Sequence, residues 1–295
     1  MNEVLIDMLI KQADEGDKTE NYRKENNAYK KLYNLYKREL GRKNKYTIDI
    51  LENLAISYDN LGVYNKSLEL LKEVYVIRKE ILGENHLDTI SALDNLAFSY
   101  NNIGDYNNAS KIENTVYKLR KENLGEEHSD TLFTLGNLAS YCSNLGDYKK
   151  ALKLHEKVYV SRKEILGESH PDTLSALNNL ANSYSDLGDY NKAGKLQNIV
   201  FNTRKEILGK NHPDTLRSLA NLANSYYCLG DYKKALKIDN AIYNTQKEIL
   251  GESHPDTLST LNNLTVYYSY LGDYKKSLEI ENEVYNTRKE IFGEN

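Results

Sequence analysis

The sequence predicts an all-α fold, a right-handed α-solenoid of stacked helix-turn-helix repeats. Three observations predict it. A Leu-Gly pair recurs every 42 residues without insertion or loss, at 40–41, 82–83, 124–125, 166–167, 208–209 and 250–251. Each unit carries two apolar stripes at helical spacing. The chain has no tryptophan and no set of four short strands per unit, which argues against a β-propeller of similar period. Each unit is therefore expected to pack on its neighbours.

Residues 1–45 are predicted to form a degenerate N-terminal capping repeat. They keep the closing Leu-Gly pair at 40–41, but the polar segment 14–20 has lost the turn glycine of the later copies. A polar outer face suits the terminal repeat of an array. Six 42-residue units follow, at 46–87, 88–129, 130–171, 172–213, 214–255 and 256–295, the last without the end of its loop.

The unit at 172–213 shows how each copy divides into two helices. Leu177, Leu180 and Tyr184 share one face of the first helix. Gly188 ends that helix, because glycine tolerates a positive φ, and Tyr190 begins the second. The Asp-Thr pair that opens most copies is expected to cap the first helix through the aspartate, with the three prolines in the loop before it. These aspartates are Asp88, Asp130, Asp172, Asp214 and Asp256, and the prolines are Pro171, Pro213 and Pro255.

The pattern within each copy resembles a known family. Leu177-x-x-Leu180-Ala-x-x-Tyr184, followed by Gly-Asp-Tyr190, is similar to the tetratricopeptide repeat (TPR), and the run 162–181 resembles the 42-residue repeats of kinesin light chains. The resemblance extends from residue 46 onward. It implies a TPR stack that binds other proteins. Kinesin light chains also share an N-terminal heptad coiled coil, and this chain has no sustained heptad run.

Composition narrows the classes of partner. The net charge is −4, with Lys and Arg spread evenly, which argues against nucleic-acid binding. The two cysteines, Cys142 and Cys228, stand at different places in their repeats, so no disulfide framework or Cys-x-x-Cys metal site is expected. The N-terminus lacks the pattern of an export signal, and no segment has the length and apolar character of a membrane span. We therefore expect a cytoplasmic protein without membrane contact.

The family resemblance implies that the first helix of each copy lines a concave peptide-binding groove. One groove position is asparagine in all six units. Its amide can donate and accept, so a row of them could pair with the backbone of an extended or short helical peptide. The alternative is that each asparagine bonds to a neighbouring repeat. The variable positions favour basic ligand residues over the first two units and an apolar or aromatic anchor over the last two. The predicted peptide-binding residues are Asn53, Asn95, Asn137, Asn179, Asn221, Asn263, Asp49, Glu52, Asp94, Phe98, Asn182, Arg217, Asn224, Tyr227 and Tyr270.

Residues that could suggest chemistry follow the repeat instead. One loop histidine per copy is expected to be structural, because metal ligands must converge and repeat equivalents are spaced apart. These are His86, His128, His170, His212 and His254, while the non-periodic His155 is expected at the surface. The sequence contains no P-loop, Gly-x-Ser-x-Gly or His-Glu-x-x-His motif. No catalytic residue, metal or cofactor is therefore predicted.

The predicted function is a non-catalytic protein–protein interaction scaffold. The alternative is a regulatory or sensor repeat arm, or a fragment of a larger signalling NTPase or of a kinesin light chain-like cargo adaptor. The last helix carries apolar residues that a further repeat would cover, so end-to-end self-association through this uncapped C-terminal helix is a further expectation. These residues are Leu278, Ile280, Val284 and Ile291.

Overall fold

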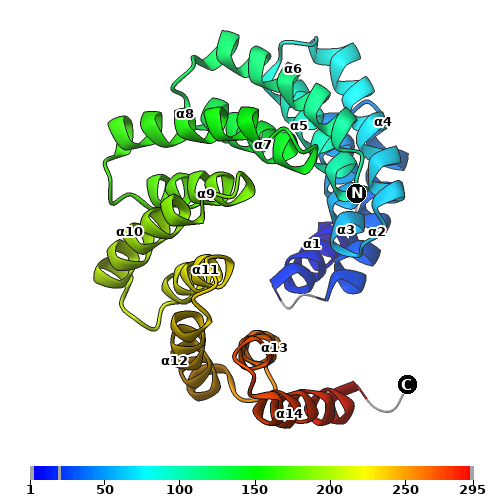
Figure 1. Ribbon diagram of the computed structural model, residues 1–295. Coiled ribbons are helices and arrows are strands. Elements are labelled where there is room, and N and C mark those ends of the chain that lie inside the picture. Colours follow the sequence, from blue (N-terminus) through cyan, green and yellow to red (C-terminus); the bar gives the residue numbers. More distant parts are fainter. Residues whose placement is uncertain (1–2, 19–20, 293–295) are drawn as a thin grey trace. The chain divides into compact units, whose positions relative to one another are not determined.

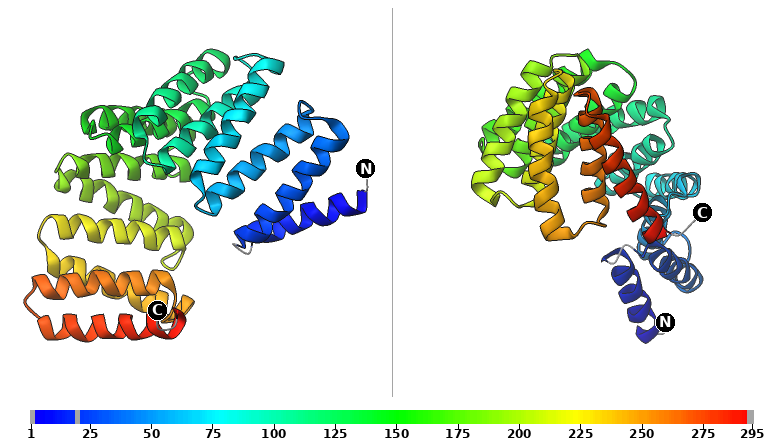
Figure 2. Two further views of the ribbon diagram at one scale, coloured as in Figure 1. Left: turned by 90° about the vertical axis from the view of Figure 1, so that its right-hand side faces the viewer. Right: turned by 60° about the horizontal axis from the view of Figure 1, so that its bottom comes forward.

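The computed structural model describes residues 3–18 and 21–292, which form fourteen helices and no strand (Figures 1 and 2). The all-α, helix-turn-helix prediction is confirmed. The helices are α1 (Glu3–Lys18), α2 (Tyr22–Leu40), α3 (Lys45–Asn60), α4 (Tyr64–Leu82), α5 (Leu87–Asn102), α6 (Tyr106–Leu124), α7 (Ser129–Asn144), α8 (Tyr148–Leu166), α9 (Pro171–Asp186), α10 (Tyr190–Leu208), α11 (Pro213–Cys228), α12 (Tyr232–Leu250), α13 (Pro255–Tyr270) and α14 (Tyr274–Phe292).

The chain divides into two compact units, residues 1–154 (unit 1) and 155–295 (unit 2), and the division falls within α8. In each unit every helix packs on the next one along the chain, from α1 to α7 in unit 1 and from α9 to α14 in unit 2. Figure 2 shows these neighbours side by side. We call the odd-numbered helices, the first of each pair, A helices, and the even-numbered ones B helices.

From α3 onward, the turn within each pair is closed by glycine, as predicted. At Gly188 φ is 81°, in the left-handed region that side chains disfavour. Two backbone hydrogen bonds of 2.9 Å seal this end of α9, from Gly188 to Ser185 and from Asp189 to Tyr184. The side chain of Asp189 then accepts a 3.0 Å bond from the Lys192 amide and caps α10.

The predicted caps of the A helices were wrong by two residues. The N-cap of α9 is His170, whose Nδ1 accepts a hydrogen bond of 3.2 Å from the Asp172 amide. Pro171 is the first residue of the helix rather than part of the loop, which suits a residue with no N–H to satisfy. The aspartate lies in the first turn, where its charge complements the helix dipole. The same histidine cap occurs at His86, His128, His212 and His254.

Small and branched apolar residues fill the space between helices. Five A helices bury a fully covered alanine at the same place in the repeat, at Ala55, Ala97, Ala139, Ala181 and Ala223, and the B helices bury Ala109, Ala151, Ala193 and Ala235. Alanine at these places lets the helices approach closely. Larger residues such as Leu51, Val74 and Ile242 then close the gaps between them.

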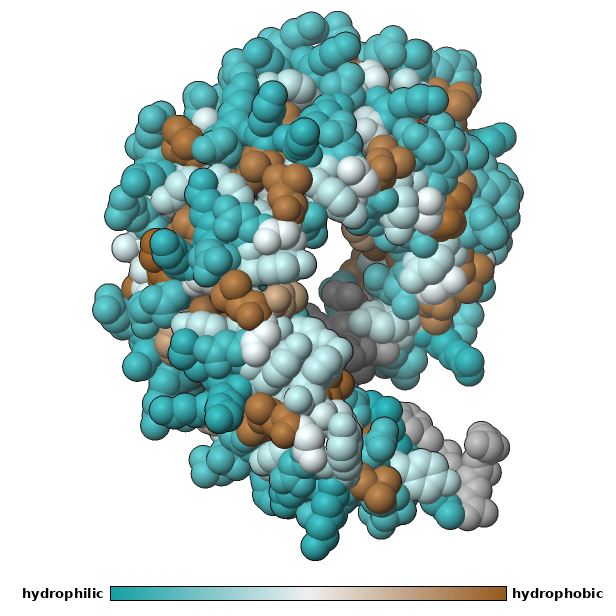
Figure 3. Space-filling view, in the orientation of Figure 1, coloured by the Kyte–Doolittle hydropathy of each residue, from teal (hydrophilic) through white to brown (hydrophobic). Residues whose placement is uncertain are grey.

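Surface apolar residues are scattered. On the face seen in Figure 3 the hydrophobic residues form small separate groups among hydrophilic ones. On α14, Leu278 is 59% exposed, but Ile280 and Val284 are buried against the preceding helices, so the predicted exposed strip was wrong for these two. The side chain of Ile291 lies outside the described residues, and self-association through α14 stays a prediction. Within the described part of the chain, no helix has the length and apolar character needed to span a bilayer.

Candidate functional site

The A helices of consecutive pairs are linked directly to one another. In each such link the two bonded residues lie 43 positions apart in the sequence. In unit 1 they are Asn95 to Glu52 at 2.9 Å and Asn144 to Asn101 at 3.2 Å. In unit 2 they are Asn221 to Asn178 at 2.8 Å and Tyr227 to Tyr270 at 3.4 Å. Within each unit the A helices thus lie side by side and form one surface, which we call the A-helix face.

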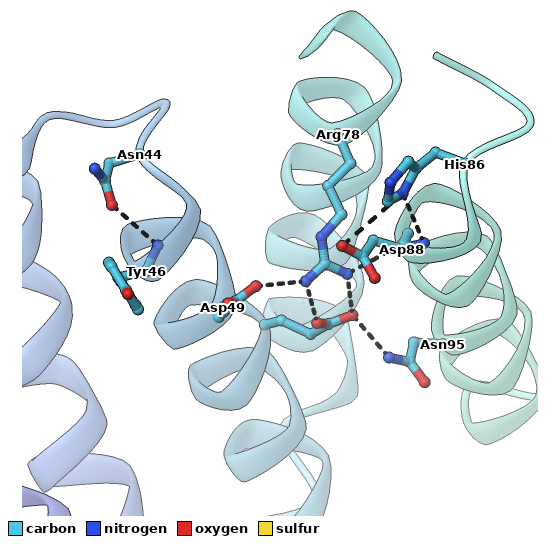
Figure 4. A network of polar contacts seen from close by, with 8 residues as sticks. Asn44, Tyr46, Asp49, Arg78, His86, Asp88 and Asn95 are labelled. Atoms are coloured by element: carbon cyan, nitrogen blue, oxygen red, sulfur yellow. Dashed lines mark hydrogen bonds and ion pairs between the residues drawn. The ribbon is translucent and has the colours of Figure 1, made fainter. Parts of the chain in front are cut away.

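The acidic residues predicted to meet a basic ligand are engaged within unit 1 (Figure 4). Arg78, on α4, contacts Glu52 through both of its terminal nitrogens, at 2.9 and 2.7 Å, and Asp49 at 2.9 Å. Burial opposes the charge of Arg78, but its hydrogen bonds to Glu52 and Asp49 outweigh burial and raise its pKa. Arg78 also donates to the backbone oxygen of Asp88 at 3.2 Å, so it joins α3, α4 and α5. One of the two negative charges predicted here is thereby neutralised locally.

Asp94 belongs to a second buried polar cluster. Arg120 holds it at 2.8 Å, and the carboxyl of Glu113, which is fully buried, lies nearby. Burial, followed by the charge of Asp94, raises the pKa of Glu113 to about 9, so this carboxyl is neutral at physiological pH. Asn137 and Tyr141 also interact with Glu113. The cluster is thus a structural contact between α5, α6 and α7.

The equivalent arginine of unit 2 has neutral partners. Arg204 donates to Ser218 Oγ at 2.8 Å, to Ser175 Oγ at 3.3 Å and to the backbone oxygen of Asp214 at 3.3 Å. Burial lowers the pKa of Arg204, and the charge of Arg217 lowers it further against the attraction of Asp214. Arg217, a predicted groove residue, is itself 69% exposed and paired with Asp214. The helix junction around Arg204 in unit 2 therefore differs in charge from the helix junction around Arg78 in unit 1.

The six invariant asparagines do not share one environment. Asn95 and Asn221 bond to the preceding A helix, and Asn263 donates to Asp239 on the preceding B helix at 3.2 Å. Asn137 interacts with Glu113. Asn53 is half-buried and Asn179 is exposed. For four of the six, the amide contacts a neighbouring repeat, which is the alternative that the sequence left open.

A second position of the repeat, unlike that of the asparagines, is exposed in all six copies. Three residues after each invariant asparagine, the A helices present a side chain that is exposed in all six copies and varies in type. Phe98, at 53%, is the most exposed of its apolar members. The set is Ile56, Phe98, Ser140, Asn182, Asn224 and Val266. It contains three of the predicted peptide-binding residues.

Tyrosines gather at the ends of α11 and α13. The Tyr227 and Tyr270 rings are 5.6 Å apart, and the Tyr232 ring stacks on Tyr270 at 4.6 Å. Figure 3 shows this part of the A-helix face as a pale area of intermediate hydropathy. Tyr270 is 56% exposed, so the two predicted tyrosines do form one aromatic surface.

Sequence reasoning missed a row of buried polar residues on the B helices. His155 was predicted at the surface, but it is only 6% exposed, and its Nδ1 lies 2.7 Å from Ser183 Oγ. The prediction was wrong because it considered the histidine alone and not its place in the repeat. The equivalent residues Glu113, Gln197 and Asp239 are buried as well. All four stand three residues before a buried valine or isoleucine, and this helical spacing was the signal that could have found them.

No metal centre emerges from these clusters. Within residues 3–18 and 21–292, no group of three or more His, Cys, Asp or Glu side chains is placed to hold a metal ion. The loop histidines cap helices instead, each through its Nδ1.

Comparisons with known proteins agree with this architecture. The tetratricopeptide repeat profile matches residues 46–122, 89–164, 130–198, 172–247 and 220–290. Among curated protein sequences, no match is found. A solved kinesin light chain with nearly identical TPR-like repeats, from Podospora anserina, is 25% identical, with a TM-score of 0.61, over 68% of this chain and 95% of that one.

Two further solved structures have a similar fold. BtubC (BKLC) from P. vanneervenii is 19% identical, with a TM-score of 0.62, over 84% of this chain and 94% of that one. A signal transduction ATPase with a tetratricopeptide repeat sensor, from Pyrococcus horikoshii, is 16% identical, with a TM-score of 0.67, over 95% of this chain and 41% of that one. The predicted resemblance to kinesin light chain repeats is confirmed by the first two structures.

Proposed function

Since the chain belongs to the tetratricopeptide repeat family, we propose that it is a non-catalytic scaffold that binds segments of other proteins on its A-helix face. The observation that carries this proposal is the exposed and variable position of the A helices. A constant frame of buried alanines and partly bonded asparagines presents one exposed side chain per repeat, and that side chain changes from copy to copy. Different side chains on a regular frame can distinguish between ligand sequences.

The chemistry of this row favours a peptide as ligand. Ile56, Phe98 and Val266 offer apolar contacts, while Asn182 and Asn224 offer amides that both donate and accept. An extended or helical peptide presents side chains and backbone groups at intervals that such a surface can meet. A protein segment therefore fits these residues better than a small polar metabolite.

A selection from a displayed random peptide library, using the full chain as bait, tests the proposal. Binding of the enriched peptides is then measured for a triple variant Ile56→Ser, Phe98→Ser, Val266→Ser. The matched control carries Val76→Ser, Ile199→Ser and Tyr285→Ser, which alter exposed apolar residues of B helices. We expect the first variant to lose about tenfold or more in affinity, because truncating exposed apolar contacts at a binding surface removes hot-spot energy.

Both variants should unfold at the temperature of the wild type, because all six residues are exposed. Equal loss of affinity in the control would place the binding surface on the B helices and contradict the proposal. Failure of the library to enrich any sequence would contradict it as well. The second candidate function, a sensor arm of a signalling ATPase, is supported only by a shared fold. Peptide binding is therefore the function to test first.

A further inference from the structure

Two cavities occupy equivalent places in the repeat, four repeats apart. One lies between α3, α4 and α5 in unit 1 and has a volume of about 250 Å³. The other lies between α11, α12 and α13 in unit 2 and measures about 540 Å³. The walls correspond residue by residue, with Ile48, Asp49, Arg78 and Ile81 in the first matched by Leu216, Arg217, Gln246 and Ile249 in the second. We call the larger one the 211–263 cavity.

The larger cavity lacks the ion pair that stands at the smaller one. In unit 1 the Arg78 side chain lines the cavity and pairs with Glu52 at 2.7 Å. In unit 2 both partners are replaced, by Gln246 and Ala220. The Gln246 Oε1 accepts a 2.7 Å hydrogen bond from the Thr260 hydroxyl on α13, so the shorter amide is held to one wall. Ala220 now forms part of the wall, together with residues deeper in the junction.

The walls of the 211–263 cavity favour an uncharged occupant. Leu216, Ile242 and Ile249 supply aliphatic surface, and Gln246 and Thr260 already bond to each other. The two charged groups of the wall, Arg217 and Asp256, are of opposite sign and 69% exposed. A buried charge would therefore lose hydration without a partner charge inside the cavity, whereas an apolar side chain would gain from burial.

We propose that the 211–263 cavity is an anchor pocket for one bulky uncharged side chain, of leucine, methionine or phenylalanine type, from a bound peptide. Asn263, one of the invariant asparagines of the A-helix face, lines the cavity. A peptide on that face can thus enter the cavity with a single side chain. In unit 1 the protein occupies the equivalent space with its own arginine. This inference rests on the proposed function and adds where and by what chemistry the ligand is anchored.

The probes are synthetic peptides of one sequence, Ser-Ala-Ser-X-Ser-Ala-Ser with blocked ends, in which X is leucine, methionine, phenylalanine, serine, lysine or glutamate. Binding is followed by NMR of labelled isoleucine methyl groups in the full chain. Ile249 reports on the 211–263 cavity, and its counterpart Ile81 reports on the smaller one. We expect the three bulky uncharged peptides to shift the Ile249 signal with at least about tenfold higher affinity than the other three, while the Ile81 signal stays in place.

A restoring variant tests the cause. Ala220→Asp with Gln246→Arg, beside the existing Thr260, rebuilds in unit 2 the set Asp94, Arg120 and Thr134 that already coexists in unit 1. It should fold as the wild type does and lose the Ile249 response. The opposite variant, Glu52→Ala with Arg78→Gln, should give the Ile81 signal a response to the same peptides.

Several results would overturn the inference. They are an Ile249 response of equal size to the serine peptide, no response to any peptide at millimolar concentration, or an unchanged response in a folded restoring variant. The outcomes are separable from failure of the proposed function. Library peptides that depend on Phe98 while Ile249 stays silent would leave peptide binding in place and remove only the anchor pocket.

Discussion

The Tyr267 hydroxyl on α13 donates a hydrogen bond of 3.0 Å to the Asp239 carboxylate on α12. Asn263 donates to the same oxygen at 3.2 Å, while the other oxygen of Asp239 has no hydrogen-bond partner. Asp239 is 1% exposed. Burial raises its pKa to about 6, since the two donors only partly offset the loss of hydration. One helix junction of unit 2 therefore contains an acid that titrates near neutrality.

We predict that Asp239→Asn makes the protein more stable at pH 7. In the wild type the folded-state pKa lies above the ordinary value of 3.8, so the native state binds the proton more tightly than the unfolded chain does. The contribution of the Asp239 carboxyl to the free energy of unfolding is complete below about pH 4 and is lost as the pH rises through about 6. The difference is about 3 kcal/mol at most. Asparagine stays neutral and keeps an acceptor for Tyr267. The free energy of unfolding, measured by denaturation between pH 4 and 8, should change less with pH in the variant than in the wild type.

The control for this prediction is Glu281→Gln. Glu281 stands at the equivalent place in the next repeat and is exposed, so its replacement should leave the pH profile of the wild type unchanged. A pH profile of Asp239→Asn that parallels the wild type would show that Asp239 does not titrate in this range.

The repeat period predicted the architecture because each copy repeats the same local signals. Leucines at helical spacing and glycines at the turns fixed the helices, and Gly188 ends its helix as expected. The cap of that helix could not be predicted in the same way. Aspartate is a common N-cap, and the sequence cannot show that the helix starts two residues earlier, at Pro171, with His170 as its cap. The assignment of residues 1–45 as a capping repeat and the limits of the six 42-residue repeats stay predictions.

A second prediction concerns this cap. His170→Ala should destabilise the protein by about 1 kcal/mol, because the Asp172 amide loses its acceptor at the start of α9. His170→Asn should restore most of the loss, since Asn44 already caps α3 by accepting from the Tyr46 amide at 3.0 Å. Urea unfolding measures both. An asparagine variant as unstable as the alanine variant would argue that the histidine acts through its ring packing instead.

Arg78 and Glu52 should show strong energetic coupling. Arg78→Gln alone leaves the Glu52 carboxylate, 14% exposed, without its guanidinium, and so should be clearly destabilising. Adding Glu52→Ala removes the unpaired charge and reproduces the pair found at 246 and 220. We expect a coupling energy of about 1–3 kcal/mol in a double-mutant cycle. Additive losses of stability would show that Asp49, and not Glu52, is the partner that compensates the charge of Arg78.

The candidate surface was less predictable than the fold. The sequence places Asp49 and Glu52 on the A helices, but it cannot show that Arg78, from the following helix, pairs with both. This pairing depends on how three helices meet in space. Phe98, Asn182 and Asn224 of the exposed row were predicted as groove residues, but their exposure was not, because position in a repeat indicates a face of a helix and not the fraction that neighbours leave uncovered.

The last prediction tests the buried acid of unit 1. Glu113→Gln should be more stable than the wild type at pH 8, by several kcal/mol at most, and the advantage should shrink towards pH 5. Burial, then the charge of Asp94, raises the folded-state pKa of Glu113 from 4.5 to about 9, so its contribution to stability is complete below pH 4.5 and declines as the pH rises to about 9. Glutamine is neutral throughout, stands at the equivalent Gln197, and can donate its amide to Asp94. A stability difference that stays constant between pH 5 and 8 would show that Glu113 has the same protonation in the folded and unfolded chain.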